Sequence, residues 1–209
     1  MTAPLSFIPV VLSLGLLIAQ PAIAAIIHVS PALPLRIPFD SSLDIDLNGD
    51  ALPDLNFSNN FQDVIAHPLH STRFIARELL PLESAHIAVN LDPETWIGSS
   101  VPAGYVWTGE LVGIASCTNA GGLSCIGPFV NGLGYLGVEF QIAGATHYGW
   151  MALLPGEGFA IRMDIVEWAY ESLPNTPIRA GQIPEPAALP LLLGALLLWS
   201  AHRSRDRQS

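Results

Sequence analysis

Residues 135–142 read YLGVEFQI, and this stretch decides the fold. Apolar side chains recur at every second position, which is the period of a β-strand and not of a helix. Successive side chains of a strand point to opposite faces of its sheet. The stretch therefore predicts a strand with one buried face, formed by Leu136, Val138, Phe140 and Ile142.

The same alternation recurs in two other parts of the chain. Residues 42–47 (SLDIDL) place an apolar side chain at every second position. Residues 161–165 (IRMDI) do so as well, but the phase slips at Ile165-Val166, and Val166, Trp168 and Tyr170 then continue the apolar face. One extra residue in a strand, a β-bulge, would reconcile the two halves.

Turn residues separate these segments at short intervals, as in Leu154-Pro155-Gly156 and in residues 172–175 (SLPN). Short strands with frequent turn signals are typical of β-sandwiches and jelly rolls. We therefore expect an all-β, sandwich or jelly-roll-like domain over residues 25–182. One expected exception is residues 72–80, where a short helix would place Phe74, Ile75 and Leu79 on one face.

The N-terminus has the features of an export signal. An apolar run over residues 7–19 is followed by Ala22-Ile23-Ala24, the small residues that a signal peptidase requires. No Lys or Arg precedes the run, so only the α-amino group is positive there. Residues 1–24 are therefore predicted to be a signal peptide with Ala25 as the mature start. The alternative is an uncleaved N-terminal anchor.

The C-terminus combines three features in a fixed order. Ile183-Pro184-Glu185-Pro186 comes first, an apolar run over residues 187–201 follows, and a tail with three arginines ends the chain. The run would form about 22 Å of helix, against about 30 Å for a bilayer core. Arginines can reach the membrane interface and hold their end in the cytoplasm. We expect a transmembrane helix, with a buried helix of the globular domain as the alternative.

This order of features resembles the PEP-CTERM sorting signal of exported Gram-negative bacterial proteins. The resemblance spans residues 183–209 and implies recognition near Pro184, Glu185 and Pro186 by an exosortase, a membrane-embedded protease. It also implies passage through the inner membrane and delivery to the cell surface or the extracellular matrix. Families with this signal tend to occur with exopolysaccharide production, so a biofilm role is expected.

A second resemblance lies upstream of this signal. The short motifs YLGVEF (residues 135–140), HYGWM (147–151), EWAYE (167–171) and PIRAG (177–181) are similar to a module found in many such proteins. That module carries no assigned biochemical activity. The resemblance therefore implies a shared domain without implying a reaction.

Cys117 and Cys125, the two cysteines of the chain, flank a Gly-rich segment. An even number of cysteines in an exported protein favours a disulfide. A metal or redox pair is the alternative, but the spacing is not C-x-x-C and no His lies nearby in the sequence.

Residues 46–54 (DLNGDALPD) form the best chemical motif. The motif resembles the calcium loops of EF-hand-like and thrombospondin-type repeats. Such loops supply oxygen ligands, and Ca²⁺ prefers six to eight of them. Two positions depart from the pattern: Ala51 stands where Gly makes the sharp turn, and Phe57 where a bidentate Glu would bind. A β-hairpin turn at Asn48-Gly49 is the alternative, and both can hold. The expected Ca²⁺ ligands are Asp46, Asn48, Asp50, Asp54 and the carbonyl of Leu52.

The charge of the chain excludes one class of partner. The chain has 18 acidic residues, eight arginines and no lysine, for a net charge of −10. Phosphate backbones are bound through basic patches, so nucleic acid is not an expected partner. The H-x-x-H pair His67 and His70 is a weak zinc candidate, because Pro68 between the two histidines disfavours the helix that such pairs use.

Two further functions remain open. Six aromatic residues of the chain could stack on sugars in a carbohydrate-binding module, and His147 could line such a groove or be a packed, hydrogen-bonded histidine. No nucleophile motif or phosphate loop is present. Glu139 with Glu167, or Glu94 with Glu110, could act as acid and base, but no spacing singles these pairs out. We expect no catalytic residues, and an enzyme ranks third. The candidate stacking residues are Trp96, Tyr105, Trp107, Tyr148, Trp150 and Trp168.

Overall fold

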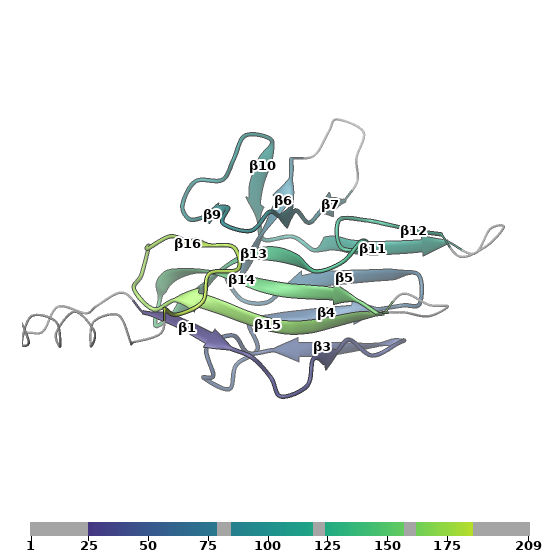
Figure 1. Cartoon of the computed structure of the whole chain (residues 1–209), viewed down its shortest axis with the longest axis horizontal. Helices are drawn as coiled ribbons and strands as arrows, with labels where there is room; N and C mark the ends of the chain where they lie inside the picture. Colours follow the sequence, from purple (N-terminus) through teal and green to yellow (C-terminus); the bar gives the residue numbers. More distant parts are fainter. Residues whose placement is uncertain (1–24, 79–84, 119–123, 157–161, 186–209) are drawn as a thin grey trace, which may run out of the picture.

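The computed structural model describes residues 25–78, 85–118, 124–156 and 162–185. These residues form an all-β protein of mostly antiparallel sheets, and they contain no helix (Figure 1). The larger sheet has eight strands in the order β1-β15-β14-β13-β6-β10, with β2 beside β15 and β8 beside β13. Its strands are β1 (Ile26–Val29), β2 (Leu35–Arg36), β6 (Arg73–Arg77), β8 (Asn90–Leu91), β10 (Tyr105–Thr108), β13 (Gly134–Ile142), β14 (Ala145–Pro155) and β15 (Met163–Glu171).

The second sheet has six strands in the order β12-β11-β5-β4-β3, and β7 joins β11 in parallel. A separate two-stranded sheet pairs β9 with β16. The strands of the second sheet are β3 (Ser41–Ile45), β4 (Leu55–Asn59), β5 (Asp63–Pro68), β7 (His86–Ile87), β11 (Val112–Thr118) and β12 (Ser124–Ile126). The two-stranded sheet consists of β9 (Trp96–Ile97) and β16 (Ile178–Arg179).

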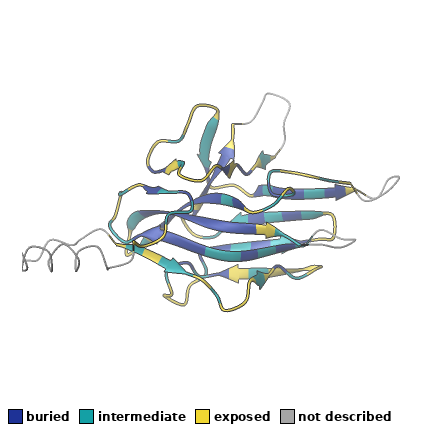
Figure 2. Cartoon of the chain, in the orientation of Figure 1, coloured by how far each residue is buried: buried dark blue, intermediate teal, exposed yellow. Residues whose placement is uncertain are grey.

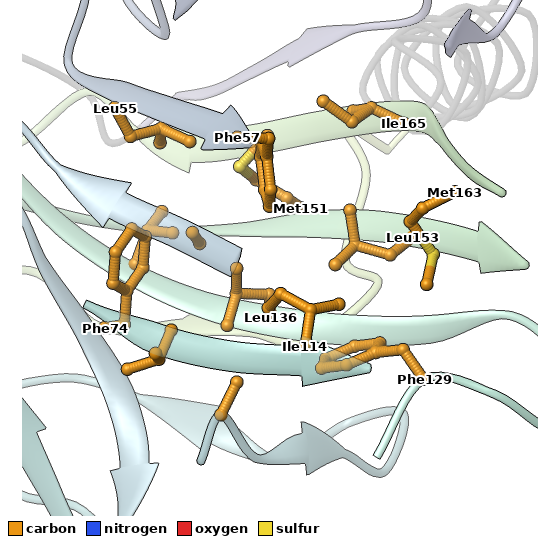
Figure 3. Packing of buried hydrophobic residues seen from close by; sticks show 14 of the residues in the cluster. Leu55, Phe57, Phe74, Ile114, Phe129, Leu136, Met151, Leu153, Met163 and Ile165 are labelled. Carbon is orange, nitrogen blue, oxygen red and sulfur yellow. The ribbon is translucent and has the colours of Figure 1, made fainter. Parts of the chain in front are cut away.

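One hydrophobic core takes side chains from both large sheets. Phe57 of β4 and Ile114 of β11 come from the six-stranded sheet, and Leu136 of β13 and Met151 of β14 come from the eight-stranded sheet (Figure 3). All four are fully buried. This arrangement fits a β-sandwich, in which the inner faces of two sheets enclose the core.

A second apolar cluster covers the other face of the larger sheet. Ile178 of β16 and Ile97 of β9 pack there with Tyr148 and Trp150 of β14. As a result β14 is buried on both faces, and Figure 2 shows long buried stretches on the central strands. The sequence of a strand with two buried faces is typically a continuous apolar run, without the alternation of apolar and polar residues.

The predicted strand over residues 135–142 is confirmed within β13. Leu136, Val138 and Phe140 are buried in the main core, and Ile142 packs against it. The other face is also covered, because Glu139 is buried and accepts a hydrogen bond from Arg73 Nε at 2.8 Å. The prediction that this strand has a single buried face was therefore wrong, because both of its faces are covered.

The predicted irregularity in β15 is also confirmed. Ala152 is paired with Glu167 and Leu153 with Ile165, so Val166 is the extra residue of a bulge. Ile165 and Trp168 both face the main core on either side of the bulge. Val166 instead packs against the second cluster, so its expected place on the face of Trp168 was wrong.

The helix expected at residues 72–80 is wrong for its described part. Arg73–Arg77 form strand β6, which pairs with β10 and β13. Phe74 points into the main core and Ile75 into the second cluster, so the apolar residues are consecutive. Periodicity alone does not separate such a strand from a buried helix. Leu79 and Leu80 lie outside the described residues.

Both predicted membrane-related segments lie outside the described residues: the signal peptide, 1–24, and the helix and basic tail within 186–209. Among the residues that the structure does describe, no helix is long and apolar enough to cross a membrane. In Figure 1, the start of β1 and the chain after β16 lie at the same end of the domain.

Candidate functional site

The Asp-rich loop, residues 46–54, connects β3 to β4 in an antiparallel hairpin. The carboxylate of Asp46 accepts backbone N–H bonds from Gly49 at 2.7 Å and from Ala51 at 2.7 Å. Asn48 Oδ1 accepts from the backbone of Asp50 at 2.9 Å. Local bonds from Asp and Asn to following backbone groups favour turns over strands, so the sequence itself folds this loop.

Two residues of the loop have left-handed backbone conformations, Gly49 with φ of 79° and Ala51 with φ of 70°. Glycine adopts this conformation freely, whereas a residue with a Cβ does so at a cost. Ala51 is the position at which the calcium-loop pattern has Gly. The chain therefore makes the sharp turn at the expected position despite the substitution.

The backbone of Leu47 fixes the loop to the core. Its N–H donates to Asp54 Oδ2 at 2.7 Å, and its carbonyl oxygen accepts from Trp168 Nε1 at 3.1 Å. The backbone N–H of Asp54 also donates to the Ile45 carbonyl at 2.8 Å. Both backbone polar groups of buried Leu47 are therefore satisfied, one by Asp54 within the loop and one by Trp168 of β15, which ties the loop to the larger sheet.

Asp54 is the buried acid of this loop, with 8% of its surface exposed. Burial raises the pKa of its carboxyl above the usual value, and the negative charges of Asp46 and Asp50 act in the same direction. The bond from the Leu47 N–H and the nearby His70 oppose this rise in pKa. A bound cation would relieve the same repulsion.

Three of the five predicted Ca²⁺ ligands border one hollow of about 130 Å³. Asp50, Leu52 and Asp54 line this hollow together with His70 and Gln141, whereas Asp46 and Asn48 do not. Within the described part of the chain, no three His, Cys, Asp or Glu side chains are placed together as a ready-made metal site. The structure thus forms the predicted turn and assembles only part of the predicted ligand set.

Cys117 and Cys125 form a disulfide, as expected. The two residues are directly opposite each other in the β11–β12 ladder, and Cys117 is buried in the main core. This bridge lies at the opposite end of the second sheet from the Asp-rich loop (Figure 1). It closes a segment whose residues 119–123 are outside the described ones.

The predicted sorting motif follows directly after the last residue that the fold holds by hydrogen bonds. Trp150 Nε1 donates to the Gln182 carbonyl at 3.1 Å, and the Gln182 N–H donates to the Arg179 carbonyl at 3.0 Å. Pro184 and Glu185 follow and are exposed, whereas Pro186 lies outside the described residues. The described residues of the predicted motif, Pro184 and Glu185, are therefore accessible.

The aromatic residues expected to stack on sugars do not form one surface. Tyr148, Trp150 and Trp168 are buried, and Tyr105 and Trp107 are half-buried. Trp96 is 54% exposed, and the guanidinium carbon of Arg179 lies 4.6 Å from its ring centroid. His147 is buried with Nδ1 2.8 Å from the Glu171 carbonyl, which is the packed histidine of the two alternatives.

The remaining polar candidates are dispersed. His67 Nε2 is 2.8 Å from Ser58 Oγ, and His70 lies in the turn after β5. The four glutamates named as acid–base pairs contact different basic residues: Glu139 contacts Arg73, Glu167 contacts His28, Glu94 contacts Arg179 and Glu110 contacts His86.

Sequence reasoning missed a hollow of about 320 Å³ on the outer side of the six-stranded sheet. Its apolar lining includes Ile65, Ile87, Leu111 and Ile126, and the buried His86 Nδ1 nearby has no hydrogen-bond partner among the described residues. These residues come from β5, β7, β12 and the residue before β11, so no local pattern in the sequence could have shown them together.

No protein-family model, no curated protein and no solved structure matches this chain.

Proposed function

We propose that this chain is an exported β-sandwich protein with a non-catalytic, structural role at the cell surface or in the extracellular matrix. An exosortase would recognise Pro184, Glu185 and Pro186 while the apolar run 187–201 spans the inner membrane. The mature domain would then act outside the inner membrane, in association with exopolysaccharide. The disulfide supports this proposal, because such bonds persist in oxidising compartments and are rare in the cytosol.

The observation that carries the proposal is the position of the sorting motif. Gln182 is fixed to the second cluster through Trp150, and the next residues, Ile183, Pro184 and Glu185, are exposed. A protease needs an extended and accessible segment, and exposed termini satisfy that need better than folded strands do. The domain can therefore be cut from its C-terminal segment without unfolding.

The test is the intact mass of the protein from its native envelope, with and without the exosortase. A species from Ala25 to near Pro184 that depends on the exosortase is the expected result. The Glu185→Ala variant should stay unprocessed, while Asp92→Ala, an exposed acid outside the motif, should be processed normally. A full-length C-terminus in both hosts would contradict the proposal and indicate a permanent anchor.

Calcium is a secondary part of the proposal. Ca²⁺ bound by Asp46, Asn48, Asp50, Asp54 and the carbonyl of Leu52 would stiffen the Asp-rich loop, and the turn at Ala51 and the acids around the hollow support this hypothesis. We expect weak binding at millimolar Ca²⁺, since the bidentate ligand is missing. Calorimetry that shows no heat, together with a melting temperature insensitive to chelator, would exclude the site.

A carbohydrate-binding module is the second candidate function, and Trp96 is the observation that favours it. Its exposed ring is backed by Arg179, and Arg179 is held by Glu94 at 2.7 Å. A polysaccharide pull-down should lose retention in Trp96→Ala and keep it in Leu33→Ala, which removes another exposed apolar side chain. Trp150→Ala is a poor test because Trp150 is fully buried. A secreted polysaccharide-active enzyme ranks third, and a turnover screen on polysaccharides would test it.

A further inference from the structure

The first described residue, Ala25, is fixed to the end of β15. Its backbone nitrogen lies 3.1 Å from Glu171 Oε1 and 3.2 Å from Ser172 Oγ. Its carbonyl oxygen accepts from the Ser172 N–H at 2.9 Å, and the next residue, Ile26, is paired with Glu171 in the β1–β15 ladder. Ala25 itself is exposed.

Glu171 is a buried carboxylate, with 5% of its surface exposed. Its Oε1 also accepts the Leu173 N–H at 3.0 Å and lies 3.5 Å from Ser172 Oγ. The ion pairs found among the described residues do not include Glu171. Burying an ionised carboxylate is costly unless an opposite charge and hydrogen bonds compensate it.

We propose that cleavage between Ala24 and Ala25 creates an ammonium group that forms an ion pair with Glu171, so that the fold contains a site for its own processed N-terminus. This inference rests on the export step of the proposed function. Hydrolysis adds water across the peptide bond, and at neutral pH it leaves a carboxylate on Ala24 and an ammonium on Ala25.

The geometry suits an ammonium better than a peptide nitrogen. A peptide N–H has one hydrogen, which Glu171 Oε1 and Ser172 Oγ must share. An ammonium has three hydrogens and a positive charge, so it can donate to both oxygens and pair with the carboxylate. A start one residue earlier would move the charge by about 3.5 Å, the spacing of residues in an extended chain.

The absence of lysine from the sequence makes this proposal easy to test. In the mature protein the α-amino group of Ala25 is the one alkyl amine, so an amine-reactive reagent reports on that group alone. The full chain is expressed with its own signal sequence, the processed protein is purified, and its start is confirmed by intact mass. Labelling rates between pH 7 and 10 then give the pKa of the amine.

The expected result is a pKa of the amine above the ordinary value of about 7.7–8.0 in the folded protein and near that value in urea. At pH 7.5 labelling should be about three- to tenfold slower in the folded wild type than in Glu171→Gln, which removes the charge and keeps an oxygen acceptor. Equal pKa values for the folded and unfolded wild type would overturn the proposal. The other titratable groups near this end are His147, which contacts the Glu171 carbonyl, and the His28–Glu167 pair.

A second variant keeps the test valid if Glu171→Gln does not fold. Insertion of one Ser after Ala24 moves the amine off Ala25 and leaves Glu171 unchanged, so it should also remove the rise in pKa. A mature start other than Ala25 would overturn the predicted processing and this inference together. A start at Ala25 with an ordinary pKa would overturn the ion pair alone and leave the proposed export intact.

Discussion

The indole nitrogen of Trp168 donates a hydrogen bond to the carbonyl oxygen of Leu47 across 3.1 Å, and this bond joins the Asp-rich loop to the larger sheet. Leu47 is 2% exposed, so its carbonyl oxygen is shielded from solvent. A buried carbonyl without a partner costs about 1–3 kcal/mol. The loop is therefore coupled to the stability of β15.

Replacing Trp168 by Phe should lower the free energy of unfolding by about 1–3 kcal/mol, because the Leu47 carbonyl loses its donor while most apolar contacts are kept. Urea unfolding of the processed protein measures this change. Trp96→Phe is the matched control, since Trp96 is exposed and should change stability by less than about 0.5 kcal/mol. Equal effects of the two substitutions would show that the hydrogen bond contributes nothing specific.

Asp54 should make the stability of the domain depend on pH. Burial, together with the charges of Asp46 and Asp50, raises the pKa of its carboxyl in the folded state. The stability that this group contributes is fully present below its unfolded pKa, about 3.9, and is lost as the pH rises through the higher folded pKa. Asp54→Asn keeps an oxygen for the Leu47 N–H but does not titrate.

The stability of Asp54→Asn relative to wild type should therefore increase as the pH rises from about 4 to 7. Urea unfolding in the presence of chelator at several pH values measures the difference. Identical pH dependence of the two proteins would mean that the carboxyl is not perturbed by its surroundings. Asp44→Asn is a suitable control, because Asp44 is exposed on β3.

The sequence predicted best those elements in which one face of a strand meets the core. Leu43 and Ile45 in β3 and the bulge at Val166 followed from side-chain periodicity alone. Prediction failed at β6, where the second cluster covers the outer face, so that Phe74 and Ile75 are both buried. Ile97 and Ile178 belong to the cluster that covers this face. They reach it through tertiary packing, which no local sequence pattern predicts.

The candidate site, too, was predictable from the sequence only in its local part. The turn of the Asp-rich loop was predictable because Asp46 and Asn48 bond to backbone groups within five residues. The contacts that hold the loop were not predictable, since Trp168 is separated from Leu47 by most of the chain. The contact between Ala25 and Glu171 likewise depends on the pairing of β1 with β15, which has no signature in either strand.

The buried carboxylate of Glu139 should make Arg73 important for stability. The Glu139 side chain is 8% exposed and the Arg73 side chain 45% exposed, so solvent screens the pair in part. Arg73→Met would leave a buried charge without its partner and should cost about 1–3 kcal/mol, less than for a fully buried pair. Arg36→Met is the control, because its pair with Asp164 is more exposed and should contribute less than about 1 kcal/mol.

A double-mutant cycle separates the charge pair from the packing of the arginine stem. If Glu139→Gln removes most of the cost of Arg73→Met, the two side chains are coupled and the buried charge is the cause. Additive losses would instead mean that the stem of Arg73 stabilises the sheet through its apolar contacts.

Reduction of the disulfide should destabilise the folded domain by about 2–3 kcal/mol, the chain-entropy estimate for a short loop. Cys117 and Cys125 are the two cysteines of the chain, so a reductant changes no other bond. The variant Cys117→Ala/Cys125→Ala avoids a polar atom at the buried position of Cys117 and should unfold at a lower urea concentration than the oxidised wild type. The reductant should lower the urea midpoint of the wild type but not that of the variant. A midpoint of the wild type that does not change with reductant would mean that the bond does not form in the exported protein, and the disulfide would then no longer support a role outside the cytoplasm.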